Sequence, residues 1–365
     1  MDYRKKLFSN FKLYDMDSWD KIFLETVIAN LDYHIENNET YRNYLQSEGF
    51  STSDLANIDD LYKIPVIPTL YFKSNTMYSM EREDLKWILN SSGTSGNSSE
   101  VGFDSKSIYY GLRAAYNAFR DKKLFSPIPT NYLILGYEPH GSNTMGAVKS
   151  AYNTTKLAPA ISRTYALIFK DGKYEINIDG IIKSIEKYST QPFPVRLVGF
   201  PGYIYMLVKE LKSNGIKLKL NSRSKVIMGG GWKQFSNIEI DKDEFYQLIY
   251  EVLGIEKDNI NEFFSAVEHP IAYTACKNGN FHQPIHSKVI IRNPKTLEPV
   301  EYGNLGLLSF ITPLVESMPL ISIMTDDIAY MNDNCDCGIK SPYFKISNRV
   351  GIDGIKTCVE QSVEL

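Results

Sequence analysis

The spacing of hydrophobic residues predicts alternating strands and helices through the middle of the chain. Short apolar runs typical of buried strands precede longer segments with apolar residues at helical spacing. The predicted strands are 132–135, 195–198 and 225–228, and the predicted helices are 181–188, 203–214 and 243–253. Gly215 and Gly254 follow the last two helices, where glycine favours a helix end. This alternation predicts a largely parallel sheet with helices on both faces.

The two ends of the chain follow other patterns. Residues 17–37 have apolar side chains near helical spacing, and 64–68 contains two prolines that predict an extended connection. From about residue 271 onward, short β segments without helices predict a meander or a small barrel-like part. Ligands of parallel sheets bind beyond the carboxyl ends of the strands, where 229–231 and 264–268 are expected.

Composition excludes several functional classes. The 365 residues carry a net charge of -3 and no basic block, so nucleic acid is not an expected partner. No apolar segment follows the N-terminus, so no signal peptide is expected. The tract 305–324 contains Pro313, Glu316 and Pro319, which favours buried strands and turns over a membrane span. Four cysteines without a secretory signal favour a reducing compartment, and we expect a cytoplasmic protein.

A loop rich in serine and glycine lies between two predicted strands, 87–89 and 101–103. Glycines permit positive φ, and hydroxyl and N–H groups can surround phosphate oxygens. Two interpretations stay open, a phosphate-binding loop and a solvated hairpin loop. It is not a Walker loop, because no Gly-Lys-Ser/Thr ends it. The loop consists of Ser91, Ser92, Gly93, Thr94, Ser95 and Gly96.

Three cysteines and one histidine form a possible metal site. Cys276, His282, Cys335 and Cys337 supply three thiolates and one imidazole, a complete tetrahedral set for structural Zn²⁺. Ordinary reduced thiols are the alternative interpretation. His286 is an alternative fourth ligand, although residues four apart in a strand share a face without converging on one ion.

Several motifs occur in one order that resembles adenylate-forming enzymes. The loop 91–96 resembles their phosphate loop, and Phe264-Ser265-Ala266-Val267-Glu268 resembles their aromatic-Gly-x-Thr-Glu segment. Residues 318–328 and the Cys-x-Cys-Gly stretch 335–338 resemble segments of phenylacetate–CoA ligases. Gly229-Gly230-Gly231-Trp232-Lys233 resembles the LuxE-type acyl-protein synthetase branch. The resemblance covers roughly residues 55–360.

This resemblance implies a role for each matching residue. The 91–96 loop would hold the β and γ phosphates of ATP, and Gly229, Gly230 and Gly231 would lie against the base. Phe264 would stack on adenine and Glu268 would bind Mg²⁺. Asp327 would accept hydrogen bonds from the ribose, and Arg349 would donate to ribose or phosphate. Taken singly, the alternatives are a core ring for Phe264, a strand-end surface charge for Glu268 and a turn at Asp326 and Asp327.

The chain also departs from the family pattern. No basic residue follows the phosphate loop, and Lys233 is the possible substitute. Val267 lacks the hydroxyl of its counterparts. We expect the mobile C-terminal domain, with its catalytic lysine, to be absent. Acyl-protein synthetases place a reactive cysteine near the C-terminus, and Cys358 fits this description, with Lys356 favouring its thiolate. An inert cysteine is the alternative.

The expected fold is therefore the α/β N-terminal domain of an adenylate-forming enzyme, with mostly parallel sheets and a small β-rich part. We expect a helical segment (1–75), a nucleotide-binding core (76–270), a β-rich subdomain (271–347) and a tail (348–365). The expected activity is ATP-dependent conversion of a carboxylic, fatty acid to acyl-AMP, followed by transfer to a protein thiol, with a reductase or carrier protein as acceptor. The alternatives are a CoA-ligase-like enzyme with a small acceptor and a non-catalytic nucleotide-binding subunit.

Overall fold

The computed structural model describes residues 3–16, 18–91, 98–230 and 241–349. They form two compact units, one from the described parts of Met1–Ala118 and Ala266–Leu365, the other from those of Phe119–Ser265. Residues 76–118 thus join the β-rich part and not the α/β core, which differs from the expected boundaries. The reason is visible in two contacts: Ser317 Oγ donates to the Gly102 carbonyl (2.6 Å), and the Glu316 N–H donates to Ser107 Oγ (3.1 Å).

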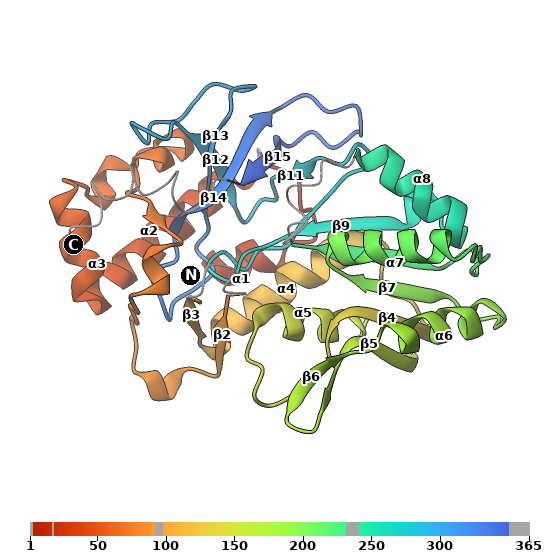
Figure 1. Cartoon of the computed structure of the whole chain (residues 1–365). Helices are drawn as coiled ribbons and strands as arrows, with labels where there is room; N and C mark the ends of the chain where they lie inside the picture. Colours follow the sequence, from red (N-terminus) through yellow and green to blue (C-terminus); the bar gives the residue numbers. More distant parts are fainter. Residues whose placement is uncertain (1–2, 17, 92–97, 231–240, 350–365) are drawn as a thin grey trace. The chain divides into compact units, whose positions relative to one another are not determined.

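The second unit contains the expected parallel sheet (Figure 1). Within this unit the strand order is β9-β8-β7-β4-β5-β6, and all neighbours are parallel except β5 and β6. The strands are β4 (Thr130–Tyr137), β5 (Ala160–Lys170), β6 (Lys173–Ile176), β7 (Val195–Gly199), β8 (Lys225–Gly229) and β9 (Ile260–Phe264). The sequence analysis predicted β4, β7 and β8 and did not name β5 or β6.

Helices cover both faces of this sheet. Leu133 and Leu135 pack with residues of α6, α7 and α8, whereas Tyr132 and Ile134 pack on the other face with Leu157 and a residue of α5. This alternation is the two-residue period of a strand that is buried on both sides. The helices are α5 (Gly146–Thr154), α6 (Ile178–Ser189), α7 (Pro201–Ser213) and α8 (Lys242–Leu253), and η6 is a short 3₁₀ helix (Lys257–Asn259).

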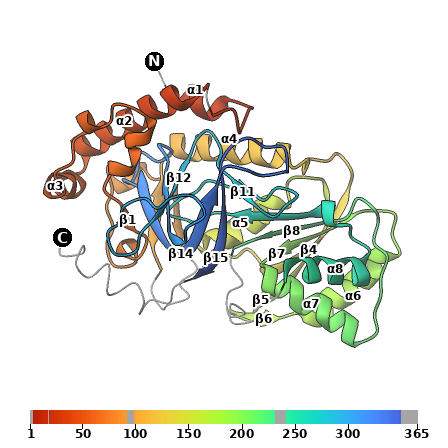
Figure 2. The same ribbon diagram turned by 90° about the horizontal axis from the view of Figure 1, so that it is seen from above.

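The first unit contains an antiparallel meander (Figure 2). Its strands follow the order β11-β15-β14-β13-β12, and β1 joins in parallel with β14, where Ile67 pairs with Ile323. The strands of this sheet are β1 (Ile67–Pro68), β11 (Phe281–His282), β12 (Lys288–Arg292), β13 (Gly306–Ile311), β14 (Ser322–Asn332) and β15 (Tyr343–Arg349). The short strand β10 (Tyr273–Thr274) precedes them in the chain and is not part of this sheet. The predicted meander after residue 271 and the extended connection around 64–68 are confirmed.

Helices and a hairpin complete the first unit. Phe23, Val27 and Leu31 of α2 are buried, as the helical pattern over 17–37 predicted. The hairpin strands β2 (Trp87–Asn90) and β3 (Glu100–Phe103) pair antiparallel. The helices are α1 (Tyr3–Ser9), α2 (Asp20–Asn37), α3 (Glu39–Ser47) and α4 (Ser105–Asp121), with 3₁₀ helices η1 (Thr52–Asp54), η2 (Ile58–Lys63), η3 (Tyr71–Lys73) and η4 (Arg82–Asp84). Across the described ranges, no helix combines the length and apolar character needed to cross a membrane.

Candidate active site and cysteine–histidine cluster

Ser91 pairs with Ser99 at the base of the predicted phosphate loop. Its N–H donates to the Ser99 carbonyl (3.0 Å), and its Oγ accepts from the Ser99 N–H (2.9 Å). These two bonds extend the β2–β3 pairing beyond Asn90 and Glu100. Ser92, Gly93, Thr94, Ser95 and Gly96 lie outside the described residues. The structure therefore establishes the hairpin that carries the loop.

The glycine motif and the aromatic motif lie side by side at the carboxyl ends of β8 and β9. Gly229 ends β8 and is the register partner of Phe263, so Phe264 follows directly at the carboxyl end of β9. A Cβ on Gly229 would lie 3.1 Å from the Phe263 carbonyl oxygen. Gly230 has a φ of +77°, and its Cβ would lie 2.7 Å from a ring carbon of Phe200. Only glycine fits this conformation and this space. Gly231 and Lys233 lie outside the described residues.

Glu268 occupies a tight turn in the first unit. Reciprocal backbone hydrogen bonds of 3.3 and 3.2 Å join Ala266 and His269 on either side of it. The residue is only 5% exposed. The interpretation of Glu268 as a strand-end surface charge is therefore wrong. A carboxylate at such a buried position is costly unless its charge is compensated, and a bound cation would supply that charge.

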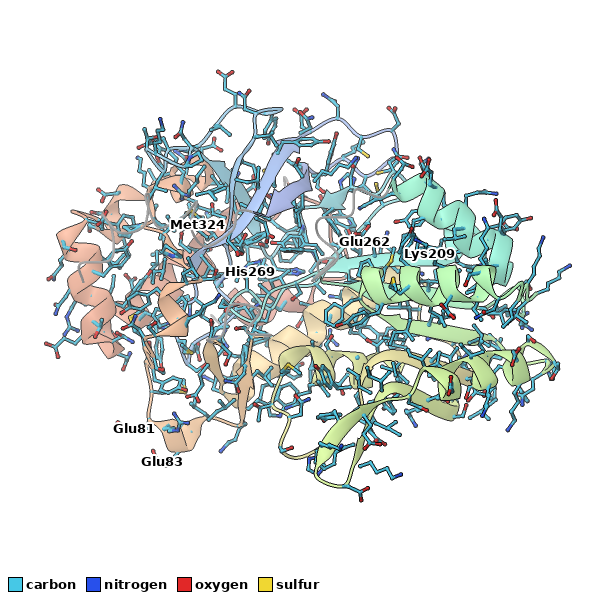
Figure 3. All side chains as sticks on the ribbon, viewed as in Figure 1. Glu81, Glu83, Lys209, Glu262, His269 and Met324 are labelled. Atoms are coloured by element: carbon cyan, nitrogen blue, oxygen red, sulfur yellow. The ribbon has the colours of Figure 1, made fainter. Side chains whose placement is uncertain are left out.

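The next residue, His269, which Figure 3 labels, is held by a buried hydrogen bond and by ring stacking. Its Nε2 lies 2.9 Å from Tyr273 Oη, and its ring stacks on Phe310 with centroids 4.4 Å apart. Burial lowers the pKa of His269 to about 3, so the imidazole is neutral. Sequence reasoning missed this anchor, although a histidine directly after the motif glutamate was a visible signal.

Asp327 and Arg349 are register partners on β14 and β15. The pairing shifts at a bulge between Ile328 and Ala329, and the Asp327 N–H donates to Thr325 Oγ1 (3.3 Å). Bulges often lie beside functional groups because they redirect side chains. Asp326 and Asp327 belong to a strand, so the alternative of a turn is wrong.

Cys276, His282, Cys335 and Cys337 converge in the first unit. Their candidate ligand atoms all lie within 4.8 Å of one another. Cys276 Sγ and Cys335 Sγ are 3.8 Å apart, which matches the ~3.8 Å separation of two sulfurs bound tetrahedrally to one Zn²⁺. His286 lies outside the cluster, with its ring 5.5 Å from that of Phe8, so the alternative fourth ligand is wrong.

Neighbouring groups orient these four donors. His282 Nδ1 donates to the Ser341 carbonyl (2.8 Å), which leaves Nε2 as the free lone pair that faces Cys337 Sγ at 3.2 Å. The N–H groups of Asn278 and Ile339 donate to the sulfurs of Cys276 and Cys337, each at 3.4 Å.

The same kind of donor changes the ionisation of Cys276. Burial opposes ionisation of this thiol, but the N–H groups around it outweigh burial and lower its pKa below the usual value. Three thiols and one imidazole whose ligand atoms lie within 4.8 Å of one another form a donor set that fits Zn²⁺. Asn278 and Gly279 form a turn directly after Cys276, with a φ of +73° at Gly279. An Asn-Gly pair is typical of turns, so it was a sequence signal for a turn beside this cysteine.

Comparison with solved structures defines the class of fold. A crystal structure of 2-hydroxyisobutyryl-CoA ligase in complex with 2-HIB-AMP matches with a TM-score of 0.69 and 15% identity, over 93% of this chain and 70% of that one. An open conformation of the same ligase, with 2-HIB-AMP and CoA, matches with a TM-score of 0.69 over 96% and 82%. The fold is that of the adenylate-forming ligases.

The particular family follows from the sequence. The family model for acyl-protein synthetase, LuxE, matches residues 8–364, so the chain belongs to this family. A long-chain-fatty-acid–luciferin-component ligase of Aliivibrio fischeri is 26% identical over 308 residues, 82% of this chain and 77% of the relative. Its counterpart from Vibrio harveyi is 26% identical over 345 residues, 89% and 83%. A phenylacetate-coenzyme A ligase of Thermus thermophilus is 22% identical over 312 residues, 82% and 62%.

These findings confirm the expected family, the α/β fold and the class of activity. The protein is an ATP-dependent ligase of the type that forms acyl-AMP and transfers the acyl group to a protein thiol. The alternative of a non-catalytic nucleotide-binding subunit is therefore not favoured.

Proposed function

We propose that this ligase activates a long-chain fatty acid and carries the acyl group on its own Cys358 before a partner protein accepts it. The observation that supports the first step best is Glu268, the motif glutamate, which is only 5% exposed in the turn between Ala266 and His269. The printed names of two relatives, both long-chain-fatty-acid ligases, support the choice of acid.

In the first step, a carboxylate oxygen of the fatty acid attacks the α-phosphorus of ATP. The bond from that phosphorus to the bridging oxygen breaks, and pyrophosphate leaves. Ser91 to Gly96 would hold the β and γ phosphates, while Gly229 to Gly231 and Phe264 would hold adenine. Asp327 would accept from the ribose hydroxyls. Holding the two reactants in line supplies much of the rate acceleration.

Charge on the departing pyrophosphate needs compensation. Glu268 would hold Mg²⁺, which, when bound, neutralises phosphate oxygens. Lys233 and Arg349 would add positive charge near the phosphates. The turn that carries Glu268 is closed by backbone hydrogen bonds between Ala266 and His269, and His269 Nε2 lies 2.9 Å from Tyr273 Oη.

In the second step, the Cys358 thiolate attacks the acyl carbon of acyl-AMP. A thioester forms, the acyl–phosphate oxygen bond breaks, and AMP leaves with the electron pair. Lys356 would favour the thiolate. The acyl group would then pass by thiol exchange to a reductase or carrier protein.

A small acceptor such as coenzyme A is the second candidate, because one relative is a phenylacetate-coenzyme A ligase. Mass spectrometry after incubation with ATP, Mg²⁺ and tetradecanoate separates the two proposals. We expect an acyl thioester on the peptide that contains Cys358, absent from Cys358→Ser and retained in Ser362→Ala. An unmodified Cys358 peptide, together with acylated free coenzyme A, would reject the protein-thiol route.

The same proposal includes a structural Zn²⁺ held by Cys276, His282, Cys335 and Cys337. Four protein donors fill a tetrahedral site, so no position stays open for a substrate. The ion would connect Cys276, in the turn that follows β10, to the Cys335–Gly338 turn between β14 and β15. Its role would be stability of the meander that carries Asp327.

A further inference from the structure

A small cavity lies at the amino ends of the strands of the parallel sheet, opposite the carboxyl ends that carry Gly229 and Phe264. It measures about 240 Å³ and opens among the amino ends of the strands. Thr130 begins β4, Lys225 begins β8, and Asn259 directly precedes β9. None of the residues that the proposed reaction uses lines this cavity.

Two of the residues that line the cavity, Arg196 and Lys225, are cations on neighbouring strands. Arg196 on β7 and Lys225 on β8 are register partners, so two like charges lie side by side on neighbouring strands. Arg196 is only 3% exposed. Burial, followed by the charges of Arg196 and Lys123, lowers the pKa of Lys225. Such crowding is unfavourable unless negative charge enters the cavity.

Both cations have neutral partners. Arg196 Nη2 donates to the Leu124 carbonyl (2.7 Å) and Nη1 to Tyr132 Oη (3.5 Å). Lys225 Nζ donates to Asn259 Oδ1 (2.9 Å). Within the described part of the chain, no carboxylate forms an ion pair with either of them.

Two further cations complete the cavity. Lys123, after α4, and Arg223, in the loop before β8, also line it. No Asp or Glu is among its described lining residues. Four cations around a small volume, one of them almost fully buried, form a donor set that suits phosphate oxygens.

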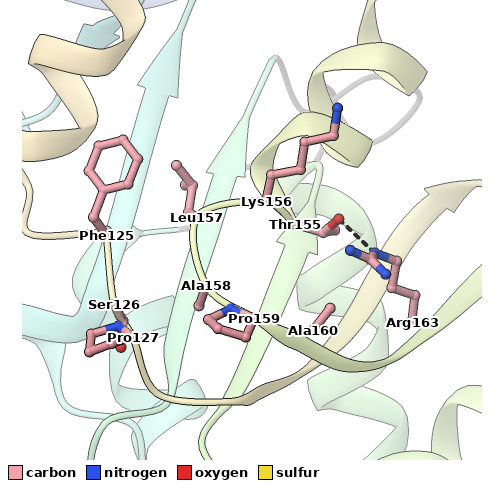
Figure 4. Close-up of a pocket in the computed structure, with 10 residues that line it drawn as sticks. All are labelled: Phe125, Ser126, Pro127, Thr155, Lys156, Leu157, Ala158, Pro159, Ala160 and Arg163. Carbon is pink, nitrogen blue, oxygen red and sulfur yellow. Dashed lines mark hydrogen bonds between the residues drawn. The ribbon is translucent and has the colours of Figure 1, made fainter.

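An adjoining hollow extends this cavity, because Phe125 and Ser126 line both. Its volume is about 620 Å³. Figure 4 shows the residues that line it. Pro127, Leu157 and Pro159 give it apolar walls. Arg163, whose Nε donates a hydrogen bond to Thr155 Oγ1 (2.7 Å), and Lys156 also line this hollow.

We infer that the cavity at Arg196 and Lys225 binds the phosphate group of a phosphorylated small molecule, whose less polar part occupies the adjoining hollow. The site is distinct from the proposed adenine site at Gly229 and Phe264. It lies at the amino ends of the strands, whereas those two residues lie at the carboxyl ends of β8 and β9. It does not depend on the proposed function.

Titration calorimetry of the full chain tests this inference, with inorganic phosphate and phenyl phosphate as probes at constant ionic strength. We expect phosphate to bind and phenyl phosphate to bind more tightly. Lys225→Gln and Arg223→Gln should each weaken binding about tenfold, since each removes a charge-assisted hydrogen bond. Lys183→Gln removes an exposed charge on α6 and should leave binding unchanged.

Two results would overturn the inference. One is the absence of phosphate binding by the unmodified chain, and the other is an equal loss in Lys183→Gln. Arg223 is exposed, so its variant should fold normally and keeps the test decisive if Lys225→Gln is unstable. Pyrophosphate exchange that requires the fatty acid substrate should be unchanged in the same variants. An unchanged exchange rate would distinguish the phosphate site from the proposed site of acyl-AMP formation.

Discussion

His282 Nε2 lies 3.2 Å from Cys337 Sγ, although 55 positions separate the two residues in the chain. Pairing of β11 with β15 brings them together, because His282 is the register partner of Tyr343. The turn Cys335–Gly338 lies between β14 and β15, and it places the sulfurs of Cys335 and Cys337 close to His282. The contact therefore depends on the meander, and the meander would in turn be held by an ion at this point.

Removal of one sulfur should release the metal. Cys337→Ala should lose the single equivalent of Zn²⁺ that we expect by elemental analysis, and its unfolding temperature should fall by several degrees. The reason is that metal-binding free energy contributes directly to folding. Asp336→Asn changes the exposed residue between the two cysteines and should retain both metal and stability. A protein purified without chelator that holds no zinc would contradict this prediction.

Gly230→Ala should be more harmful than an ordinary glycine substitution. Gly215 and Gly230 both have positive φ, at +70° and +77°, but only Gly230 would place its Cβ against the Phe200 ring. We expect Gly215→Ala to cost about 1 kcal/mol of unfolding free energy and Gly230→Ala about 1–3 kcal/mol more. Gly230→Ala should also raise the KM for ATP. Denaturant unfolding and ATP kinetics measure both effects, and equal losses in the two variants would argue against the close packing at Gly230.

Acid should destabilise the first unit through buried neutral histidines. Burial lowers the pKa of His34 from 6.5 to about 4, and its Nδ1 and Nε2 lie 2.7 Å from Ser79 Oγ and 3.1 Å from the Val315 carbonyl. Burial also lowers the pKa values of His269 and His286 to about 3. Between about pH 6.5 and 4, the unfolded chain binds protons that the native chain does not. Stability is therefore complete above pH 6.5 and is lost as the pH falls.

One histidine contributes up to about 1.4 kcal/mol per pH unit in this window. Urea unfolding at several pH values should show a shallower dependence for His34→Gln than for the unmodified chain. His140 belongs to the second unit, where it stacks on Phe169, and His140→Gln is the control for the loss of a histidine outside the first unit. An identical slope in His34→Gln would contradict the assignment of a neutral buried imidazole.

The sequence predicted the parallel sheet well because its strands are buried on both faces and read as short apolar runs. It missed β5 because that strand is only partly buried and alternates with polar residues, as in Ser162 and Thr164. It also missed α3, whose buried residues include Tyr41 and Tyr44 in an otherwise polar segment. Partial burial weakens the pattern on which such predictions depend.

The candidate site shows the same limit. The sequence identified the donors Cys276, Cys335 and Cys337 but left the imidazole open between His282 and His286, because only strand pairing decides which ring reaches the sulfurs. It gave no sign of the basic cavity either. Arg196 lies within an apolar run, and its neighbour Lys225 is defined only by the register of β7 with β8.

The central claim is that Glu268 supports formation of acyl-AMP, and exchange of labelled pyrophosphate into ATP tests it most directly. With tetradecanoate and Mg²⁺, the unmodified chain should show exchange that requires the acid. Glu268→Gln should lower the rate about 100-fold and raise the Mg²⁺ requirement. Glu256→Gln, which removes an exposed charge, should exchange normally. Exchange by Glu268→Gln within about twofold of the unmodified rate, at the same Mg²⁺ concentration, would contradict the account.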